Sequence, residues 1–318
     1  MSIKAIIKPF VITTFTYLDY LKQWIRYNFH RANRKKLKEV QVLNTLESID
    51  YILLNNCSLS RFGDGELLMA WQYITGEPLI NNTYFQKYDE KLGQRLAEIL
   101  QLEVDKDNNQ YAIGISYSYF KGVNEMVFDA RRFLMFFVNK YSSLIASTIN
   151  TKRIYLNSEL TRFYITRKDK SKSEIIIKNI SRIWDKRNVC FIEGFQSRLG
   201  YGNDLFDNAK TIKRILCPAE NAYAKYDEIF QIAKQLPKNT LFIIALGMTA
   251  TVLAYDLYKS GYQALDLGHI DIEYEWLRMG VKKKVPIPHK YTNEADGGKT
   301  PLAIDDDTYE QQIFARII

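Results

Sequence analysis

Residues 241–251, Leu-Phe-Ile-Ile-Ala-Leu-Gly-Met-Thr-Ala-Thr, join an apolar run to a glycine and then to a helical pattern. Such a run is typical of a buried strand, and the residues after it predict a Thr-capped helix that ends before Gly261. This unit is a building block of α/β folds. Many such units bind no ligand, but the helix N-terminus can hold an anion, so Gly247 and Thr249 are candidate phosphate contacts.

The same alternation of apolar runs and helical patterns recurs along the chain. Since helices that alternate with strands connect parallel strands, we predict an α/β fold with a mostly parallel sheet. Strands are expected at 111–115, 153–156, 189–193, 214–216, 241–246 and 264–267, and helices at 42–54, 123–141, 173–184, 226–236 and 250–259.

Composition favours a folded protein that remains in the cytoplasm. The chain has 318 residues, of which 47% are hydrophobic and 25% charged, as in ordinary globular proteins. Its longest uncharged run near the start, 9–18, is shorter than the roughly 20 apolar residues that cross a bilayer, and no cleavage site follows it. Three widely spaced cysteines in apolar surroundings are expected to be reduced core thiols.

Positive charge is concentrated near the start of the chain. The net charge is +8, and the first 38 residues interleave basic and aromatic side chains. One interpretation is a solvated amphipathic helix packed on the main domain, and a second is a helix resting on acidic lipid. Contact with nucleic acid ranks third, because no recognisable motif supports it. We divide the chain into a basic helical extension (1–40), a catalytic domain (41–295) and a C-terminal tail or lid (296–318).

The segment 60–66, Ser-Arg-Phe-Gly-Asp-Gly-Glu, is the first candidate site. In extended or turn-like backbone, residues two apart project to one side, so Asp64 and Glu66 could face one Mn²⁺ or Mg²⁺ ion completed by substrate phosphates. The alternative is structural: Asp64 caps a helix and Glu66 adds favourable charge to its first turn. Taken alone, the triplet does not decide between them.

A glycine-bearing loop at 194–204 follows an expected strand. Ligands of open α/β sheets bind at this edge, where glycines let backbone N–H groups approach phosphates. Arg198 offers a planar fork for a diphosphate, and Asn203 or Asp204 could touch a sugar hydroxyl. The alternative is a tight turn with a surface arginine.

An acid-rich segment at 266–276 follows the last expected strand. His269 and Glu273 would share a helical face, while Asp271 and Glu275 form a second acidic edge. A lone histidine is usually structural, but one at a strand end beside acids is a candidate general base, phosphate contact or metal neighbour.

Together these segments resemble the GT-D type of bacterial glycosyltransferases, first recognised in the glycosylation of serine-rich-repeat adhesins. The basic stretch before residue 40 departs from that pattern. The matching blocks lie in the family's order at 60–66, 161–164, 197–206, 217–222, 245–256 and 267–276.

The resemblance implies a Rossmann-like domain that binds a UDP-sugar through Mn²⁺ or Mg²⁺, with Asp64 and Glu66 as the metal pair. We expect transfer of a hexose, glucose first, to a hydroxyl of a glycan on a glycoprotein, a lipid-linked oligosaccharide or another cell-surface precursor. The chief alternative is a metal-dependent phosphohydrolase or nucleotidyltransferase, and a non-enzymatic alternative is an anion- or lipid-binding module. The candidate catalytic residues are Asp64, Glu66, His269 and Glu273, and the candidate donor-binding residues are Arg61, Gly63, Arg162, Arg198, Gly202, Asn203, Asp204, Gly247, Thr249 and His269.

Overall fold

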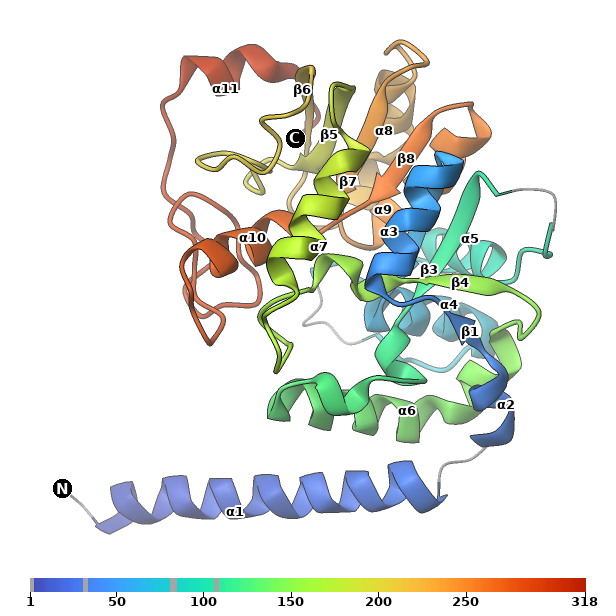
Figure 1. The fold of residues 1–318 in the computed structure, drawn as a ribbon, viewed down its shortest axis with the longest axis vertical. Helices are drawn as coiled ribbons and strands as arrows, with labels where there is room; N and C mark the ends of the chain where they lie inside the picture. Colours follow the sequence, from blue (N-terminus) through green and yellow to red (C-terminus); the bar gives the residue numbers. More distant parts are fainter. Residues whose placement is uncertain (1–2, 31–33, 81–84, 106–108) are drawn as a thin grey trace.

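The computed structural model describes residues 3–30, 34–80, 85–105 and 109–318, with the backbone alone at 3–13, 30 and 34. The described residues form a nine-stranded sheet in the order β1-β4-β3-β2-β8-β7-β5-β6-β9, and every neighbouring pair is parallel (Figure 1). The predicted α/β class and parallel sheet are thus confirmed. The strands are β1 (Gln41–Val42), β2 (Ser58–Phe62), β3 (Tyr111–Ile115), β4 (Ile154–Asn157), β5 (Asn188–Gly194), β6 (Thr211–Cys217), β7 (Leu241–Ala245), β8 (Gln263–Asp266) and β9 (Ile313–Arg316).

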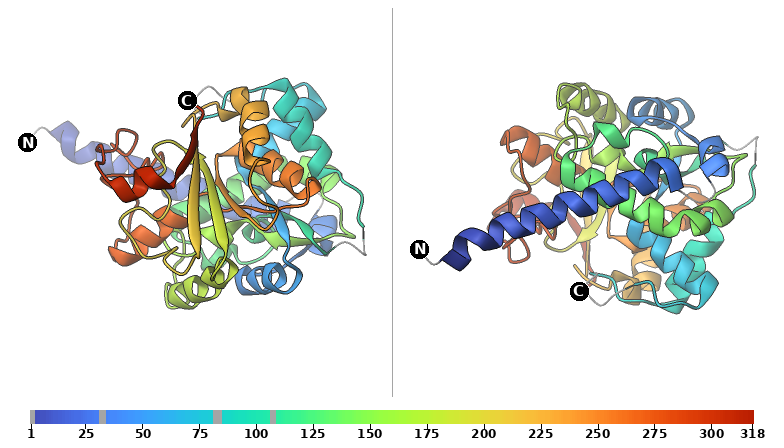
Figure 2. Two further views of the ribbon diagram at one scale, coloured as in Figure 1. Left: turned by 90° about the horizontal axis from the view of Figure 1, so that it is seen from above. Right: turned by 90° about the horizontal axis from the view of Figure 1, so that it is seen from below.

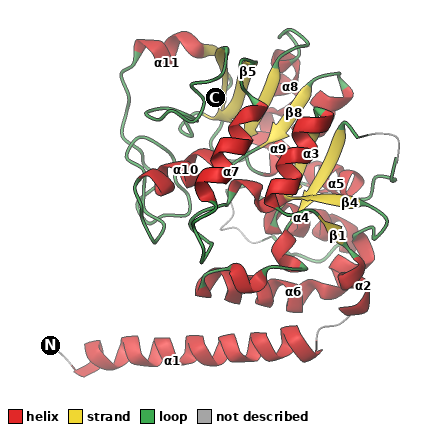
Figure 3. Ribbon diagram, viewed as in Figure 1, coloured by secondary structure: helices red, strands yellow, loops and turns green. Residues whose placement is uncertain are grey.

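Helices cover both faces of the sheet (Figure 3). The helices α3 and α7 pack together on one face, and α4, α5, α9 and α8 form a continuous layer on the other. None of the described helices is long and apolar enough to cross a membrane. The helices are α1 (Ile3–Ile25), α2 (Arg34–Glu39), α3 (Thr45–Asn55), α4 (Asp64–Thr75), α5 (Glu90–Leu100), α6 (Phe128–Thr148), α7 (Ser173–Ile180), α8 (Tyr226–Ala233), α9 (Met248–Lys259), α10 (Ile270–Arg278) and α11 (Asp307–Gln312).

The strand β7 shows why its sequence is continuously apolar. Side chains alternate between the two faces of a strand, and both faces of this sheet are covered by helices. Leu241 and Ile243 therefore pack in the core beneath α3 and α7, whereas Phe242 and Ile244 pack in the core beneath α8 and α9.

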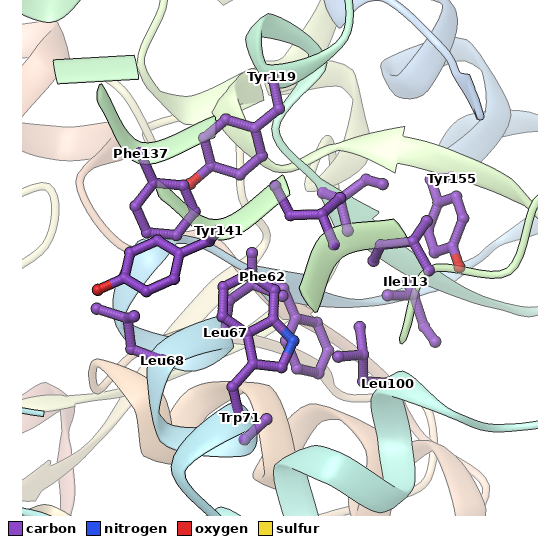
Figure 4. Close-up of a cluster of buried hydrophobic side chains, with 14 of the residues drawn as sticks. Phe62, Leu67, Leu68, Trp71, Leu100, Ile113, Tyr119, Phe137, Tyr141 and Tyr155 are labelled. Carbon is purple, nitrogen blue, oxygen red and sulfur yellow. The ribbon is translucent and has the colours of Figure 1, made fainter. Parts of the chain in front are cut away.

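An aromatic cluster fixes α6 across the ends of α4 and β3 (Figure 4). Trp71 on α4 lies 6.0 Å from the ring of Phe137 on α6, measured between centroids, and Phe137 stacks on Tyr119 at 5.0 Å. The Trp71 indole N–H also donates a hydrogen bond to Thr148 Oγ1 at 3.0 Å. Since rigid aromatic packing of this kind orients a helix, the middle and the C-terminal end of α6 are held against α4.

The six expected strands each have a counterpart in the structure, but β1, β2 and β9 were not predicted. β2 contains Ser58 and Ser60, whose buried hydroxyls donate hydrogen bonds to backbone carbonyls, so its sequence lacks a continuous apolar run. The segment 296–318, expected as a tail or lid, contains α11 and also β9, which extends the sheet beside β6. All three cysteines are buried and unpaired, as expected.

Candidate functional site

A cleft of about 1050 Å³ lies at the C-terminal edge of the sheet. The chain leaving β2 runs on to β3 and β4, whereas the chain leaving β8 crosses to β9 at the opposite end of the sheet. The pair β2 and β8 is therefore a point where the direction of winding reverses, and such points are the usual ligand sites of open α/β sheets. Among the residues expected from sequence, Arg61, Gly63, Asp64, Glu66, Arg162, Gly247 and His269 line this cleft.

The acidic side of the cleft is the junction of β2 and α4. Gly63 is the N-cap of α4, so Asp64 is its first residue, and the Glu66 carboxylate accepts the Gly63 N–H at 2.9 Å. Asp64 is therefore not the N-cap that the structural interpretation assumed. Burial raises the pKa of Glu66 to about 7, and the nearby carboxylates of Asp266 and Asp64 act in the same direction. Acids crowded in this way favour a bound cation or proton.

Arg61 lies beneath these acids and holds three strand ends together. Its guanidinium pairs with Asp266 at 2.7 Å, with side-chain exposures of only 12% and 6%. The same group also donates to the Ser158 and Gly268 carbonyls and to Thr161 Oγ1. Arg61 was expected to bind the donor. Its guanidinium instead donates hydrogen bonds to the ends of β4 and β8, and so it positions the edge of the cleft.

A cationic cluster faces the acids from the opposite side. Arg162 and Lys284 both form ion pairs with the carboxylate of Glu294, and His269 Nε2 lies 3.0 Å from Glu294 Oε1 and 3.1 Å from Arg162 Nη2. Burial opposes ionisation of Glu294, but Arg162 and His269 outweigh it and hold the pKa of this carboxyl well below its usual range. These side chains form an anion-binding site, and in this structure the carboxylate of Glu294 occupies it.

His269 lies at the start of α10 in the left-handed region, with φ of 74°. Burial and then the neighbouring Arg162 lower the pKa of His269, so its imidazole is neutral at pH 7 and can accept a proton. Glu273 is fully buried behind it and outside the lining of the cleft; its Oε2 accepts the N–H groups of Tyr164 and Ile165, both at 2.9 Å. Glu273 positions the loop that follows Arg162.

Residues 281–300, which we call the strap, form the outer wall of the cleft and include Lys282, Lys283, Lys284, Glu294 and Lys299. Lys290 pins the strap, because its buried ammonium pairs with Asp271 at 2.6 Å and with Glu275 at 3.2 Å. A second anchor is Arg198, whose Nη1 donates to the carbonyls of His289 and Leu302 at 2.6 and 2.7 Å.

Several residues expected in the donor pocket lie outside the lining of the cleft. Arg198 contacts the strap as described, and the Asn203 amide donates to the Asp271 and Glu275 carboxylates. The carbonyl of Gly202 accepts a hydrogen bond from Arg278, and Asp204 accepts one from the Tyr274 hydroxyl. The loop 194–204 therefore supports α10 and the strap through these side chains.

The turn after β7 contributes Gly247 to the lining of the cleft. Its φ is +56°, and a Cβ there would lie 2.0 Å from the ring of Phe85, so the position accepts only glycine. Thr249 is fully buried beneath this turn, and its hydroxyl has no hydrogen-bond partner among the described residues. Gly247 thus lines the cleft, whereas Thr249 does not.

Glu159, Glu294 and Lys284 are among the lining residues that were not identified as site residues from sequence. Glu159, at the end of β4, accepts hydrogen bonds from the hydroxyls of Ser116 and Ser118 and pairs with Arg167 at 2.8 Å. Glu294 carries no local motif that could have revealed it. Lys284 belongs to the run of three lysines at 282–284, and this local positive charge could have indicated an anion-binding residue from sequence.

The donor set suits a cation shared with a ligand better than an all-protein metal cage. In the part of the chain that the structure describes, no group of three or more His, Cys, Asp or Glu side chains could hold a metal ion by itself. Mg²⁺ and similar ions are commonly held by one or two carboxylates plus substrate phosphates. Asp64 and Glu66, both in the lining of the cleft, are the candidates for such a pair, and a bound cation would offset the repulsion between carboxylates that helps to raise the pKa of Glu66.

Comparisons with known proteins agree with this architecture. The chain is 36% identical over 283 residues to a probable glycosyl transferase Gly of Streptococcus gordonii, and 36% identical over 284 residues to glycosyltransferase GlyD of Streptococcus pneumoniae. These matches cover 88% and 89% of this chain but 39% and 33% of those proteins, so the chain spans well under half of their length.

Solved structures show the same similarity. One, described as a conserved domain of unknown function 1792 with a distinct glycosyltransferase fold, is 38% identical with a TM-score of 0.81, and the match covers 90% of this chain and 99% of that one. Another, described as a new glycosyltransferase from Streptococcus sanguinis, is 35% identical with a TM-score of 0.79 and covers 88% and 100%. The family model for the glycosyltransferase GT-D fold matches residues 59–295. The chain therefore belongs to the glycosyltransferases of the GT-D fold.

Proposed function

We propose that this glycosyltransferase transfers a hexose, with glucose as the first candidate, from a UDP-sugar to a hydroxyl of a glycan acceptor. The observation that carries the proposal is the cleft itself, which is lined by the carboxylates of Asp64 and Glu66 and also by the cationic side chains of Arg162 and Lys284. Acids on one side suit a Mg²⁺ or Mn²⁺ ion, and cations on the other suit a diphosphate. Family membership favours this activity over a phosphohydrolase or nucleotidyltransferase.

Asp64 and Glu66 would hold the metal ion, which when bound supplies positive charge against the leaving diphosphate. Both carboxylates lie in the first turn of α4. The Gly63 N–H donates to Oε2 of Glu66 and so orients this carboxylate in the lining of the cleft.

Arg162 and Lys284 would stabilise the negative charge that grows on the diphosphate as the glycosidic bond breaks. Both now neutralise Glu294, so the donor phosphate competes with this carboxylate for them. His269 is the proposed general base, because its lowered pKa keeps it able to accept the proton of the attacking hydroxyl.

The acceptor would enter along the wall that α6 and the preceding loop contribute. Met126, Ala130, Phe133 and Leu134 make this wall apolar, opposite the polar strap. We propose a glycan on a glycoprotein or on a lipid-linked oligosaccharide as the acceptor. The three buried unpaired cysteines support the proposal that the enzyme acts in the cytoplasm, where thiols stay reduced.

The test is a screen for UDP release over a panel of nucleotide sugars, with Mn²⁺, with Mg²⁺ and with EDTA. Asp64→Asn and Glu66→Gln should each lower turnover at least about 100-fold, as expected when a group that stabilises the transition state is removed. Asp50→Asn is the matched control, since this exposed acid lies on α3, away from the cleft. Turnover that is independent of metal, or unchanged in both site variants, would reject the proposed donor site.

A further inference from the structure

The helix α1 and the turn that follows it, Arg26–His30, expose an unusual amount of apolar surface. Isolated exposed apolar residues are ordinary, but a contiguous patch of large ones usually marks an interaction site. We call this patch the outer face. Its six side chains are between 39% and 68% exposed: Phe15, Leu18, Leu21, Trp24, Ile25 and Phe29.

The opposite side of α1 is fixed to α6. The ring of Tyr20 stacks on Phe128 at 4.7 Å, and Asp19 pairs with Arg132 at 3.2 Å. Further along, the Asn139 amide donates to the Gln23 side chain and backbone, both at 3.0 Å. These contacts set the rotation of α1, so the outer face is directed away from the protein body. The helix lies beside α6, and its N-terminal part projects past the body (Figure 2).

The positive charge of the chain is concentrated in the same segment as the exposed apolar side chains. Residues 1–40 contain nine Lys and Arg against two acidic residues, so they hold seven of the eight net positive charges of the chain. The remainder of the protein is close to neutral. Lys22 is four residues after Leu18 and three before Ile25, so this ammonium lies on the outer face among the apolar side chains.

We propose that the outer face of α1 docks on the surface of an anionic lipid bilayer, with the helix lying parallel to the membrane plane. Apolar side chains beside lysine and arginine, with an aromatic residue at the boundary, are the combination that interfacial helices use. Anionic headgroups attract the basic residues, and the apolar row enters the acyl boundary. This orientation agrees with the finding that no described helix could span a membrane.

Docking would place the cleft beside the bilayer. The helix α6 carries α1 on one side and supplies Ala130, Phe133 and Leu134 to the cleft on another. Phe133 is itself 46% exposed, and Phe136 on the same helix is 44% exposed. Phe133 and Phe136 thus add exposed apolar surface to the helix that both carries α1 and borders the cleft.

Trp24 provides a direct probe of docking. It is 40% exposed, whereas the other three tryptophans, Trp71, Trp184 and Trp276, are fully buried. On addition of vesicles containing about 30 mol% phosphatidylglycerol in phosphatidylcholine, the emission should shift to shorter wavelength, and Trp24→Phe should abolish the shift. Vesicles of phosphatidylcholine alone should give a much smaller change, and high salt should weaken the response.

Co-flotation of the full-length protein with the same vesicles measures the electrostatic and the apolar contributions to binding separately. Lys22→Gln with Arg26→Gln should weaken partitioning roughly 25-fold, at about fivefold for each charge near an anionic surface. The control is Lys178→Gln with Lys259→Gln, which removes two exposed charges from α7 and α9 and should leave partitioning unchanged.

Leu18→Glu with Leu21→Glu should abolish flotation, whereas Leu54→Glu should not, although Leu54 is 83% exposed on α3. Far-UV circular dichroism and UDP release from a nucleotide sugar should match the unmodified protein in all these variants, because none lies in the cleft. Equal binding to neutral and anionic vesicles would overturn the proposal, as would no binding with a concentration-dependent dimer that Leu18→Glu disrupts. The second result would identify another copy of the chain as the occupant.

Discussion

The substitution Arg61→Lys tests whether Arg61 positions the edge of the cleft or binds the sugar donor. The substitution keeps the charge but replaces five donors in a rigid fork with one ammonium group. A lysine there could retain the ion pair with Asp266. It would lose most of the remaining contacts, which are the hydrogen bonds to the Ser158 carbonyl, Thr161 Oγ1 and the Gly268 carbonyl.

The loss of these three hydrogen bonds sets the expected change in the free energy of unfolding. A net value of about 1 kcal/mol for each lost hydrogen bond predicts that the free energy of unfolding falls by about 3 kcal/mol. Urea unfolding followed by tryptophan fluorescence measures it, because Trp71, Trp184 and Trp276 are fully buried. The matched control is Arg132→Lys: its ion pair with Asp19 is exposed by 38% and 41%, so the change should be below about 0.5 kcal/mol.

Turnover provides the second readout. Because Arg61 ties β2 to β4 and β8, its loss should displace the strand ends and lower kcat, with a smaller effect on KM for the nucleotide sugar. An unfolding free energy equal to that of the unmodified protein, together with a strongly raised KM, would refute this reasoning. That result would indicate that Arg61 binds the donor, as expected from sequence.

The buried charges and thiols lead to four further expected outcomes. Lys290→Met should lower the free energy of unfolding in urea by about 3–5 kcal/mol, because two buried carboxylates lose their cation. Glu294→Gln should lower KM for the nucleotide sugar several-fold by freeing Arg162 and Lys284; a raised KM would mean that Glu294 orients them instead. Since the fold depresses the pKa of His269, its contribution to stability is complete above pH of about 6.5 and is lost as the pH falls, so His269→Gln should flatten the decline of the urea midpoint below that pH. Burial raises the pKa of all three cysteine thiols, so an aromatic disulfide reagent should label none at pH 8 in the native protein and three in urea; fast native labelling would contradict the buried placement.

Sequence patterns predicted the elements whose signals are local. The strand β7 is apolar on both faces and is followed closely by Gly247, so its position and the start of α9 could be predicted within a few residues. The expected threonine cap was wrong, because Gly247 is the N-cap of α9. The strand β9 gave no such signal, because its four residues at the sheet edge alternate between half-buried and exposed. The helix α5 was missed although its apolar residues recur with helical spacing and its N-cap Asp89 was readable.

Side-chain direction explains why the site was only partly predictable. The glycine-rich loop was correctly placed at a strand end, yet Arg198 and Asn203 turn toward the strap and α10 and away from the cleft. Arg198 has a φ of 51°, a left-handed conformation that a sequence pattern does not reveal for arginine. Glu294 is brought to Arg162 across 132 positions of sequence, and only the folded chain shows this pairing.

The segment 60–66 shows how the local and the long-range information combine. Taken by itself, its arginine, placed three residues before Asp64, suggests a cation that would accompany the two acids. In the fold this arginine pairs with Asp266 and partly offsets the effect of that carboxylate on the pKa of Glu66. If Asp266 were left unpaired, its repulsion would raise the pKa of Glu66 still further and favour the protonated acid over a cation-binding carboxylate. Arg61 therefore acts on the proposed metal pair both directly and through its ion pair with Asp266.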